Sequence, residues 1–365
     1  MRLSSPRLML AGAAVGAVAV ASGVAVAATS GPSTPARPAS ARLAADPAGD
    51  GLEVGRPGEA PADVEKFWTP ARIKAAKPLT PQAAKAGRAS APQLAALAAE
   101  PGAKGDPTLP EDSPDALSSR VSAASVKTVK TARQWTRHKK PPARTIGKLF
   151  GVDSQNRLYT CSATVISSRN KRTVWTAGHC VHSGHGGTAG FSRKLTFRPD
   201  YINGKSYGTW TADYMVVDKR WANGADPSYD VAAFTVRKYR GKGIQYYTGS
   251  QGYNFGYKKR SYPMYAFGYP ARALPSKKPM NSNRLWYCSG KTYGIRYTAG
   301  GPVHLGMDCT MGNGASGGPW LYGLKSNGLG RIVGVNSMHS DRKAEMYSPY
   351  HGSAAAAVYR KAAAL

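Results

Sequence analysis

Residues 312–319 read Gly312-Asn313-Gly314-Ala315-Ser316-Gly317-Gly318-Pro319, a serine set among glycines. Glycine adopts positive φ angles without a steric penalty, so a loop of this kind can turn several backbone N–H groups toward one point. Such a loop is either a plain glycine turn or the position of a nucleophilic hydroxyl beside backbone donors. Which of the two applies depends on the other reactive side chains of the chain.

Two further motifs carry such side chains. Thr176-Ala177-Gly178-His179-Cys180 follows an apolar run and places an imidazole where a strand ends, and histidine suits general-base chemistry because its pKa lies near neutrality. Asp230 opens the apolar run Val231-Ala232-Ala233-Phe234. Taken alone, the histidine could equally be a metal ligand or a packed loop residue, and the aspartate an ordinary strand-leading acid. All three together, in the order His179, Asp230, Ser316, indicate one catalytic site.

Between and around these motifs, short β-branched and aromatic runs recur without helical patterns. This spacing is typical of an antiparallel barrel or sandwich. Only residues 354–365 read as a helix, with Ser353 as its expected N-cap. The expected strands cover residues 148–152, 157–167, 172–177, 194–198, 210–217, 230–238, 264–269, 285–293 and 331–338.

The three motifs, in this order and on this framework, resemble the chymotrypsin-fold serine endopeptidases. The resemblance covers about residues 145–365, and the segments 265–270, 285–290 and 333–337 are similar to the bacterial glutamyl-endopeptidase-like branch. It implies an all-β fold of two antiparallel six-stranded β-barrels, about residues 145–240 and 241–350, with the active site between them and a short C-terminal helix. The function implied is peptide-bond hydrolysis by a serine endopeptidase.

The resemblance also implies the role of each site residue. Ser316 is the nucleophile, His179 the general base and then acid, and Asp230 the group that orients the imidazole. The backbone N–H groups of Gly314 and Ser316 form the oxyanion hole. Other aspartates precede less apolar runs and are therefore weaker candidates: Asp213, Asp218 and Asp226.

The expected substrate pocket departs from the family members that select Lys or Arg and from those that cleave after Glu. The resemblance places Thr310 at the pocket base, where an aspartate would select Lys or Arg. It places Asn336 where glutamate-cleaving members carry a histidine. Thr310, Asn336 and His339, with Ser337 beside them, suggest a small polar or permissive pocket, in which His339 could restore some affinity for an acidic side chain.

Four cysteines allow three pairings that the spacing alone does not separate. The resemblance implies the pairs Cys161–Cys180 and Cys288–Cys309. Zinc is the alternative use of these residues, but the paired Cys-x-x-Cys spacing of structural zinc sites is missing. We expect disulfides, with no metal and no cofactor.

The first residues predict export. Arg2 and Arg7 precede an uncharged run over residues 8–28 that ends in Ala25-Val26-Ala27, so residues 1–27 read as a cleaved signal peptide. A membrane anchor is the rival interpretation, but the run is mostly Ala, Val and Gly. No later segment is apolar enough to span a bilayer, so we expect a secreted, extracellular protein without stable membrane insertion.

Residues 28–144 are rich in Ala and Pro and poor in aromatic residues. Such a composition buries little core by itself. The segment is either a flexible spacer or a propeptide removed after export, and we favour the propeptide. The basic residues 137–140 and Arg144 are the expected cutting sites, which leaves residues 145–365 as the protease domain.

The chain carries 50 basic and 20 acidic side chains, a net charge of +30, and almost all of the excess lies after residue 115. A field of this sign attracts polyanions. Aromatic and basic residues alternate over 239–297, a pattern compatible with nucleic acid, but an exported protein makes that partner improbable. Adsorption to an anionic cell-wall polymer is the better alternative, and protein or peptide substrates are the expected partners. An inactive protease-fold binding or adhesion protein is the rival function, which the intact trio of residues disfavours.

Overall fold

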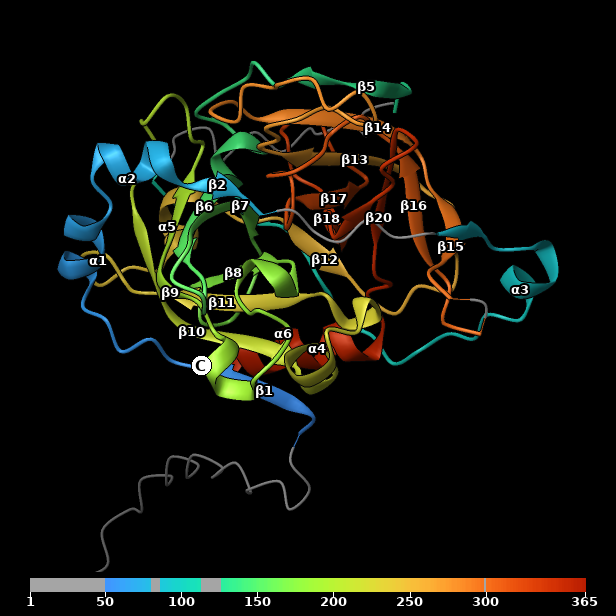
Figure 1. Cartoon of the computed structure of the whole chain (residues 1–365), viewed down its shortest axis with the longest axis horizontal. Helices are drawn as coiled ribbons and strands as arrows, with labels where there is room; N and C mark the ends of the chain where they lie inside the picture. Colours follow the sequence, from blue (N-terminus) through green and yellow to red (C-terminus); the bar gives the residue numbers. More distant parts are fainter. Residues whose placement is uncertain (1–49, 80–85, 113–125, 299) are drawn as a thin grey trace, which may run out of the picture. The chain divides into compact units, whose positions relative to one another are not determined.

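The structure is a computed structural model that describes residues 50–79, 86–112, 126–298 and 300–365 (Figure 1). The predicted signal peptide, residues 1–27, lies outside the described residues, as do residues 28–49 of the predicted propeptide. The described part consists mainly of antiparallel β-sheet with short helices at its surface.

The first barrel is a closed ring of six antiparallel strands. Along the ring they run β9, β6, β7, β8, β11 and β10, and β10 pairs with β9 to close it. Leu149 pairs with Phe197 across β6 and β9, and both side chains are fully buried in the barrel core. The strands are β6 (Ile146–Val152), β7 (Leu158–Val165), β8 (Thr173–Thr176), β9 (Arg193–Pro199), β10 (Trp210–Asp218) and β11 (Ala232–Val236).

The second half folds into two sheets that share a core. Met264 and Cys288 from one sheet pack with Met307 and Met346 from the other. The first sheet contains β12 (Gly252–Asn254), β13 (Pro263–Gly268), β14 (Trp286–Lys291), β17 (Pro319–Tyr322) and β18 (Arg331–Val335). The second contains β15 (Tyr293–Arg296), β16 (His304–Asp308), β19 (Met338–His339) and β20 (Glu345–Ser348). The predicted all-β, double-barrel fold is confirmed.

Several strands of this half were not predicted. β12, β16, β17 and β20 contain five residues or fewer, and β16 and β17 lie close to glycine in the sequence, which hides the alternation of a strand. The run predicted over 285–293 divides at Thr292 between β14 and β15. The Thr292 hydroxyl donates to Arg260 O and accepts from Tyr262 N, so this residue forms a hydrogen-bonded corner between the two sheets.

The predicted C-terminal helix is α6 (Ser353–Ala364), which packs against β10 and β11. Its N-cap is Gly352, and Ser353 is instead the first helical residue. The Ser353 N–H and hydroxyl donate to the carboxylate of Glu100, so a residue distant in sequence supplies the acceptor expected from Ser353. This corrects the predicted cap.

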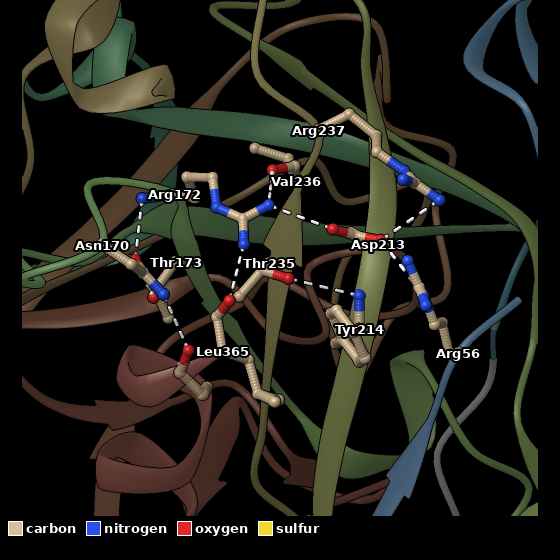
Figure 2. Close-up of polar contacts among 11 residues, drawn as sticks. Arg56, Asn170, Arg172, Thr173, Asp213, Tyr214, Thr235, Val236, Arg237 and Leu365 are labelled. Atoms are coloured by element: carbon tan, nitrogen blue, oxygen red, sulfur yellow. Dashed lines mark hydrogen bonds and ion pairs between the residues drawn. The ribbon is translucent and has the colours of Figure 1, made fainter. Parts of the chain in front are cut away.

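The far end of α6 is held by the turn between β7 and β8 of the first barrel. Asn170 Nδ2 donates to Ala362 O, and Arg172 Nη2 donates to Leu365 O (Figure 2). Arg172 also pairs with the buried carboxylate of Asp213, which receives Arg237 from the same barrel and Arg56 from the N-terminal segment. An amide and a guanidinium therefore satisfy carbonyl groups at the end of the helix, and the guanidinium also pairs with a buried acid.

Residues 50–79 and 86–112, the N-terminal segment, lie along both halves of the protein (Figure 1). The segment adds β1 (Leu52–Gly55) to β10, β2 (Lys77–Pro78) to β7, β3 (Gly87–Arg88) to β15 and β4 (Lys104–Gly105) to β12. Its helices are α1 (Pro61–Phe67), α2 (Pro70–Ala75) and α3 (Ala91–Ala95). Trp68 is its main anchor, because the side chain is 3% exposed and packs on Phe150.

Residues 129–144, the last part of the predicted propeptide, are built into the second half and the start of β6. β5 (Val129–Gln134) pairs with β14, and the buried Trp135 packs edge-on against Phe267 and Tyr287. Ala143 and Arg144 are buried directly before β6. Two further short helices are α4 (Lys219–Gly224) and α5 (Ile244–Thr248). Within the described ranges, no helix is long and apolar enough to cross a membrane.

Candidate active site

Both predicted disulfides are present. Cys161 on β7 is bonded to Cys180, which follows His179 directly, and Cys288 on β14 is bonded to Cys309, which follows β16. The first bond fixes a 3₁₀ turn, Gly178–Cys180, at the end of β8. His179 therefore sits on a short turn that a strand and a covalent bond hold from both sides.

His179 and Asp230 form the best-defined polar pair of the site. The His179 backbone N–H donates to Asp230 Oδ1 at 2.7 Å, and ring Nδ1 donates to Oδ2 at 2.8 Å. The Ser337 hydroxyl donates to the same Oδ2 at 2.5 Å. Burial raises the pKa of Asp230, but the charge of His179 and these hydrogen bonds outweigh burial and hold the pKa below its usual value of 3.8. The carboxylate is therefore ionised at neutral pH.

The three competing aspartates lie elsewhere. Asp213 pairs with arginines in the first barrel, Asp218 caps α4, and Asp226 caps the turn that precedes Asp230. Of these four acids, the described structure brings Asp230 alone to His179.

The loop around Ser316 adopts a backbone that requires glycine at two positions. Gly314 has φ of +92° and Gly317 has φ of +78°. A Cβ at Gly317 would overlap Thr176 Oγ1, so this loop packs tightly against the end of β8, close in sequence to His179. Ser316 itself is 4% exposed. The loop and the histidine turn therefore meet at the junction of the two halves.

Ser162 on β7 fixes the same loop from the first barrel. Its N–H donates to Ser316 O at 2.7 Å, and its hydroxyl donates to Gly314 O at 2.9 Å. The hydroxyl in turn accepts from Tyr269 N at 2.9 Å. One small residue therefore binds the carbonyls on both sides of Ala315.

The four predicted pocket residues have different surroundings. Thr310 Oγ1 accepts from Ala132 N of β5, and Ser337 donates to Asp230. The amide group of Asn336 is buried and hydrogen-bonded inside the protein. His339 Nε2 donates to Asn313 Oδ1 at 3.1 Å, and burial lowers the pKa of His339.

A cavity of about 620 Å³ opens beside His179. Its walls include His182, Trp221 and Met338, together with Leu79 from the N-terminal segment. His179 Nε2 is buried and has no hydrogen-bond partner among the described residues. Within the described residues, the ring nitrogen that faces away from Asp230 is therefore available to bind another group.

Three possible metal-ligand atoms converge at this point, from Cys161, His179 and Cys180. The two sulfur atoms are joined in a disulfide, so neither is a thiolate that could bind zinc. This cluster therefore does not make a metal site in its oxidised form.

No protein-family model and no curated protein sequence matches the chain. Several solved structures do match the chain. Protease Anisep from Arthrobacter nicotinovorans is 33% identical with a TM-score of 0.56, and the match covers 64% of this chain and 100% of that one. The thermostable serine protease AL20 from an extremophilic microorganism is also 33% identical, with a TM-score of 0.54 and coverage of 61% and 98%.

The chain belongs to the chymotrypsin-fold serine proteases. A Glu endopeptidase with 18% identity and a TM-score of 0.50, covering 64% of this chain and 97% of that one, shares the fold. The protease hydrolyses peptide bonds, in keeping with the relatives that are a third identical to it.

Three contributors to the protease's site have no local sequence signal. Ser162, Ser337 and Leu79 reach the site through strand pairing or through a segment distant in sequence. Ser337 was predicted as a pocket residue, and its hydrogen bond to Asp230 was not predicted. Serines beside predicted strands are common, so the role of such a serine cannot be recognised until the register of the strand pairing is known.

Proposed function

We propose that the protein is a secreted serine endopeptidase in which His179, Asp230 and Ser316 form the catalytic triad. The observation that most supports this proposal is that His179 donates two hydrogen bonds to Asp230, one from its backbone N–H and one from Nδ1. An aspartate bound in this way fixes the ring orientation and the tautomer in which Nε2 is the basic atom. Nε2 is also the atom without a partner in the described residues.

In the proposed reaction, Ser316 Oγ attacks the carbonyl carbon of the scissile bond while His179 Nε2 takes the hydroxyl proton. The Gly314 and Ser316 N–H groups stabilise the oxyanion. The C–N bond then breaks, His179 gives its proton to the leaving amine, and an acyl-enzyme remains. Water, deprotonated by His179, hydrolyses the ester and restores the Ser316 hydroxyl.

For the substrate pocket, we propose Thr310 and His339 as the polar groups that meet the substrate side chain. The Thr310 hydroxyl accepts one hydrogen bond and keeps its own O–H to donate. Asn336 and Ser337 already use their side chains inside the protein. A polar pocket without a carboxylate at its base disfavours Lys and Arg.

We further propose that the N-terminal segment restrains the enzyme before it is removed. Leu79 N donates to Thr160 O on β7 at 3.1 Å, and Leu79 forms part of the cavity wall beside His179. Pro78 lies close enough that its Cβ would be 3.2 Å from a Cβ at Gly314. We place the start of the mature domain ahead of β5 rather than at 137–144, because Thr310 hydrogen-bonds to Lys130 and Ala132.

A fluorophosphonate probe tests the triad, because it reacts only with an activated serine. We expect it to label the processed protein at Ser316 and to fail with Ser316→Ala and His179→Ala. Peptide hydrolysis should fall in both variants by several orders of magnitude while circular dichroism stays unchanged. Retained hydrolysis in folded Ser316→Ala would refute the proposal.

A further inference from the structure

Asn336 lies between β18 and β19 and is 2% exposed. Its side chain makes three short hydrogen bonds. Oδ1 accepts from Trp320 Nε1 at 2.6 Å, and Nδ2 donates to Phe267 O at 2.7 Å and to Ala315 O at 2.8 Å. Both amide hydrogens are therefore donated to backbone carbonyls, and the oxygen is held by an indole.

The contact with Ala315 O has a geometric consequence for the next residue. The carbonyl of Ala315 and the N–H of Ser316 belong to one planar trans peptide, in which the two groups point in opposite directions. A donor that holds Ala315 O on the Asn336 side therefore turns the Ser316 N–H away from Asn336. The peptide before Gly314 is held likewise, because Asn313 O accepts from Ala271 N at 2.7 Å.

Asn336 also holds the loop through its backbone. Gly317 N donates to Asn336 O at 2.7 Å, and Asn336 N donates to Gly318 O at 2.9 Å. The Asn336 side chain, together with Gly318 N, which donates to the same Ala315 O at 3.0 Å, thus fixes the peptide before Ser316, while the Asn336 main chain fixes the two residues after it. Trp320 restricts rotation of the amide, so the donor side cannot swing away from Ala315 without breaking a buried bond.

The residue before Ser316 is an alanine, so no side chain in that position can fix the loop through a charge. The neutral amide of Asn336 can fix the loop without the desolvation penalty of a buried ion. We propose that Asn336 is a positioning residue that orients the Ser316 N–H as an oxyanion donor. The inference rests on the proposed function, because it takes Gly314 and Ser316 as the oxyanion hole.

Asn336→Leu tests the inference, because leucine keeps the side-chain volume and removes the amide. We expect kcat to fall at least 10-fold, and up to the roughly 1,000-fold seen when one oxyanion donor is lost, with KM nearly unchanged. A peptide aldehyde forms a tetrahedral adduct with the serine, so its inhibition constant should rise by the same factor. The inhibition constant of a peptide acid should not move.

Asn170→Leu is the matched control. Asn170 is another asparagine with several hydrogen bonds, but it serves α6 and not the loop. We expect Asn170→Leu to lower the melting temperature and leave kcat unchanged. A folded Asn336→Leu protein with wild-type kcat and aldehyde affinity would overturn the inference.

Two further variants cover the case in which Asn336→Leu does not fold. Asn336→Ala removes both donors without adding bulk or a buried charge, so we expect a folded enzyme with the same kcat defect. Trp320→Phe frees the amide to rotate and should produce a smaller defect in kcat. Wild-type kcat in either variant contradicts the inference. Ser316→Ala, measured in the same series, separates the two proposals, because its retained activity would refute the triad itself.

Discussion

Ser337 donates from its hydroxyl to Asp230 Oδ2 at 2.5 Å, the same oxygen that accepts from the His179 ring. With the His179 backbone N–H on Oδ1, the buried carboxylate receives three hydrogen bonds. Each of them favours the ionised form, so the aspartate acts as a fixed negative charge under the imidazole.

The first prediction concerns this charge. Asp230→Asn should keep the fold and reduce kcat by about 10⁴-fold, because an amide stabilises the wrong histidine tautomer. Ser337→Ala leaves the other two bonds and should cost only about 10-fold, close to one lost hydrogen bond to a charged group. Steady-state kinetics on a peptide substrate gives both values. Equal losses in the two variants would mean that Ser337, and not the Asp230 charge, dominates.

The second prediction concerns Gly317. Gly317→Ala should abolish activity, because the new methyl group overlaps Thr176 Oγ1 in addition to occupying a φ of +78°. Gly204→Ala is the control for the backbone strain alone, since φ is +92° and no atom lies within 4 Å of its Cβ. We expect Gly204→Ala to cost about 1 kcal/mol of stability and no activity. Active Gly317→Ala enzyme would show that the loop can move away from β8.

The proposed catalytic trio could be named from the sequence because each member lies in a short, recognisable motif. The hydrogen-bond partners of Ser337 and Asn336 could not be predicted in the same way, because the partner of Ser337 is 107 residues away and that of Asn336, Phe267, is 69 residues away. A resemblance places such a residue on a strand. Which of its neighbours it bonds depends on the register of the sheets and on Trp320.

The N-terminal segment shows the same limit. Its composition predicts that it builds little core, and α2 and α3 indeed have no buried residue. Trp68 and Val64 are nevertheless buried, because the first barrel supplies the apolar surface on which they pack. Composition describes what a segment can bury alone and not what it buries against a partner.

The third prediction concerns acid stability. Burial lowers the pKa of His351 from 6.5 to about 4, and burial with the nearby Arg260 and Arg296 charges lowers that of His304 to about 3. Below pH 6.5 the unfolded chain binds protons that the folded protein excludes, so stability falls as pH decreases toward 4. His351 alone accounts for on the order of 3 kcal/mol over this window.

Urea denaturation between pH 4.5 and 7.5 measures this loss. We expect the midpoint to fall steadily below pH 6.5, and His304→Gln to reduce the slope. His185→Gln is the control, because His185 lies in an exposed loop of the first barrel. A midpoint that does not change with pH would mean that neither buried histidine stays neutral in the folded protein.

The last prediction concerns the N-terminal segment and uses the uncleaved chain. Trp68 donates from Nε1 to Lys194 O at 2.7 Å and packs on Phe150, so Trp68→Ala removes the main anchor of the segment at a cost of about 3–5 kcal/mol. Leu79 is joined to this anchor by a short stretch of chain and forms part of the wall of the cavity beside His179. We expect fluorophosphonate to label Ser316 about 10-fold faster or more in intact Trp68→Ala protein, with mass spectrometry confirming that the chain is uncut. Leu94→Ala, at a 37% exposed position of the same segment, should label at the wild-type rate. If Trp68→Ala increases hydrogen exchange over residues 50–79 without faster labelling, the segment detaches without uncovering the serine, and its proposed restraint of the enzyme is wrong.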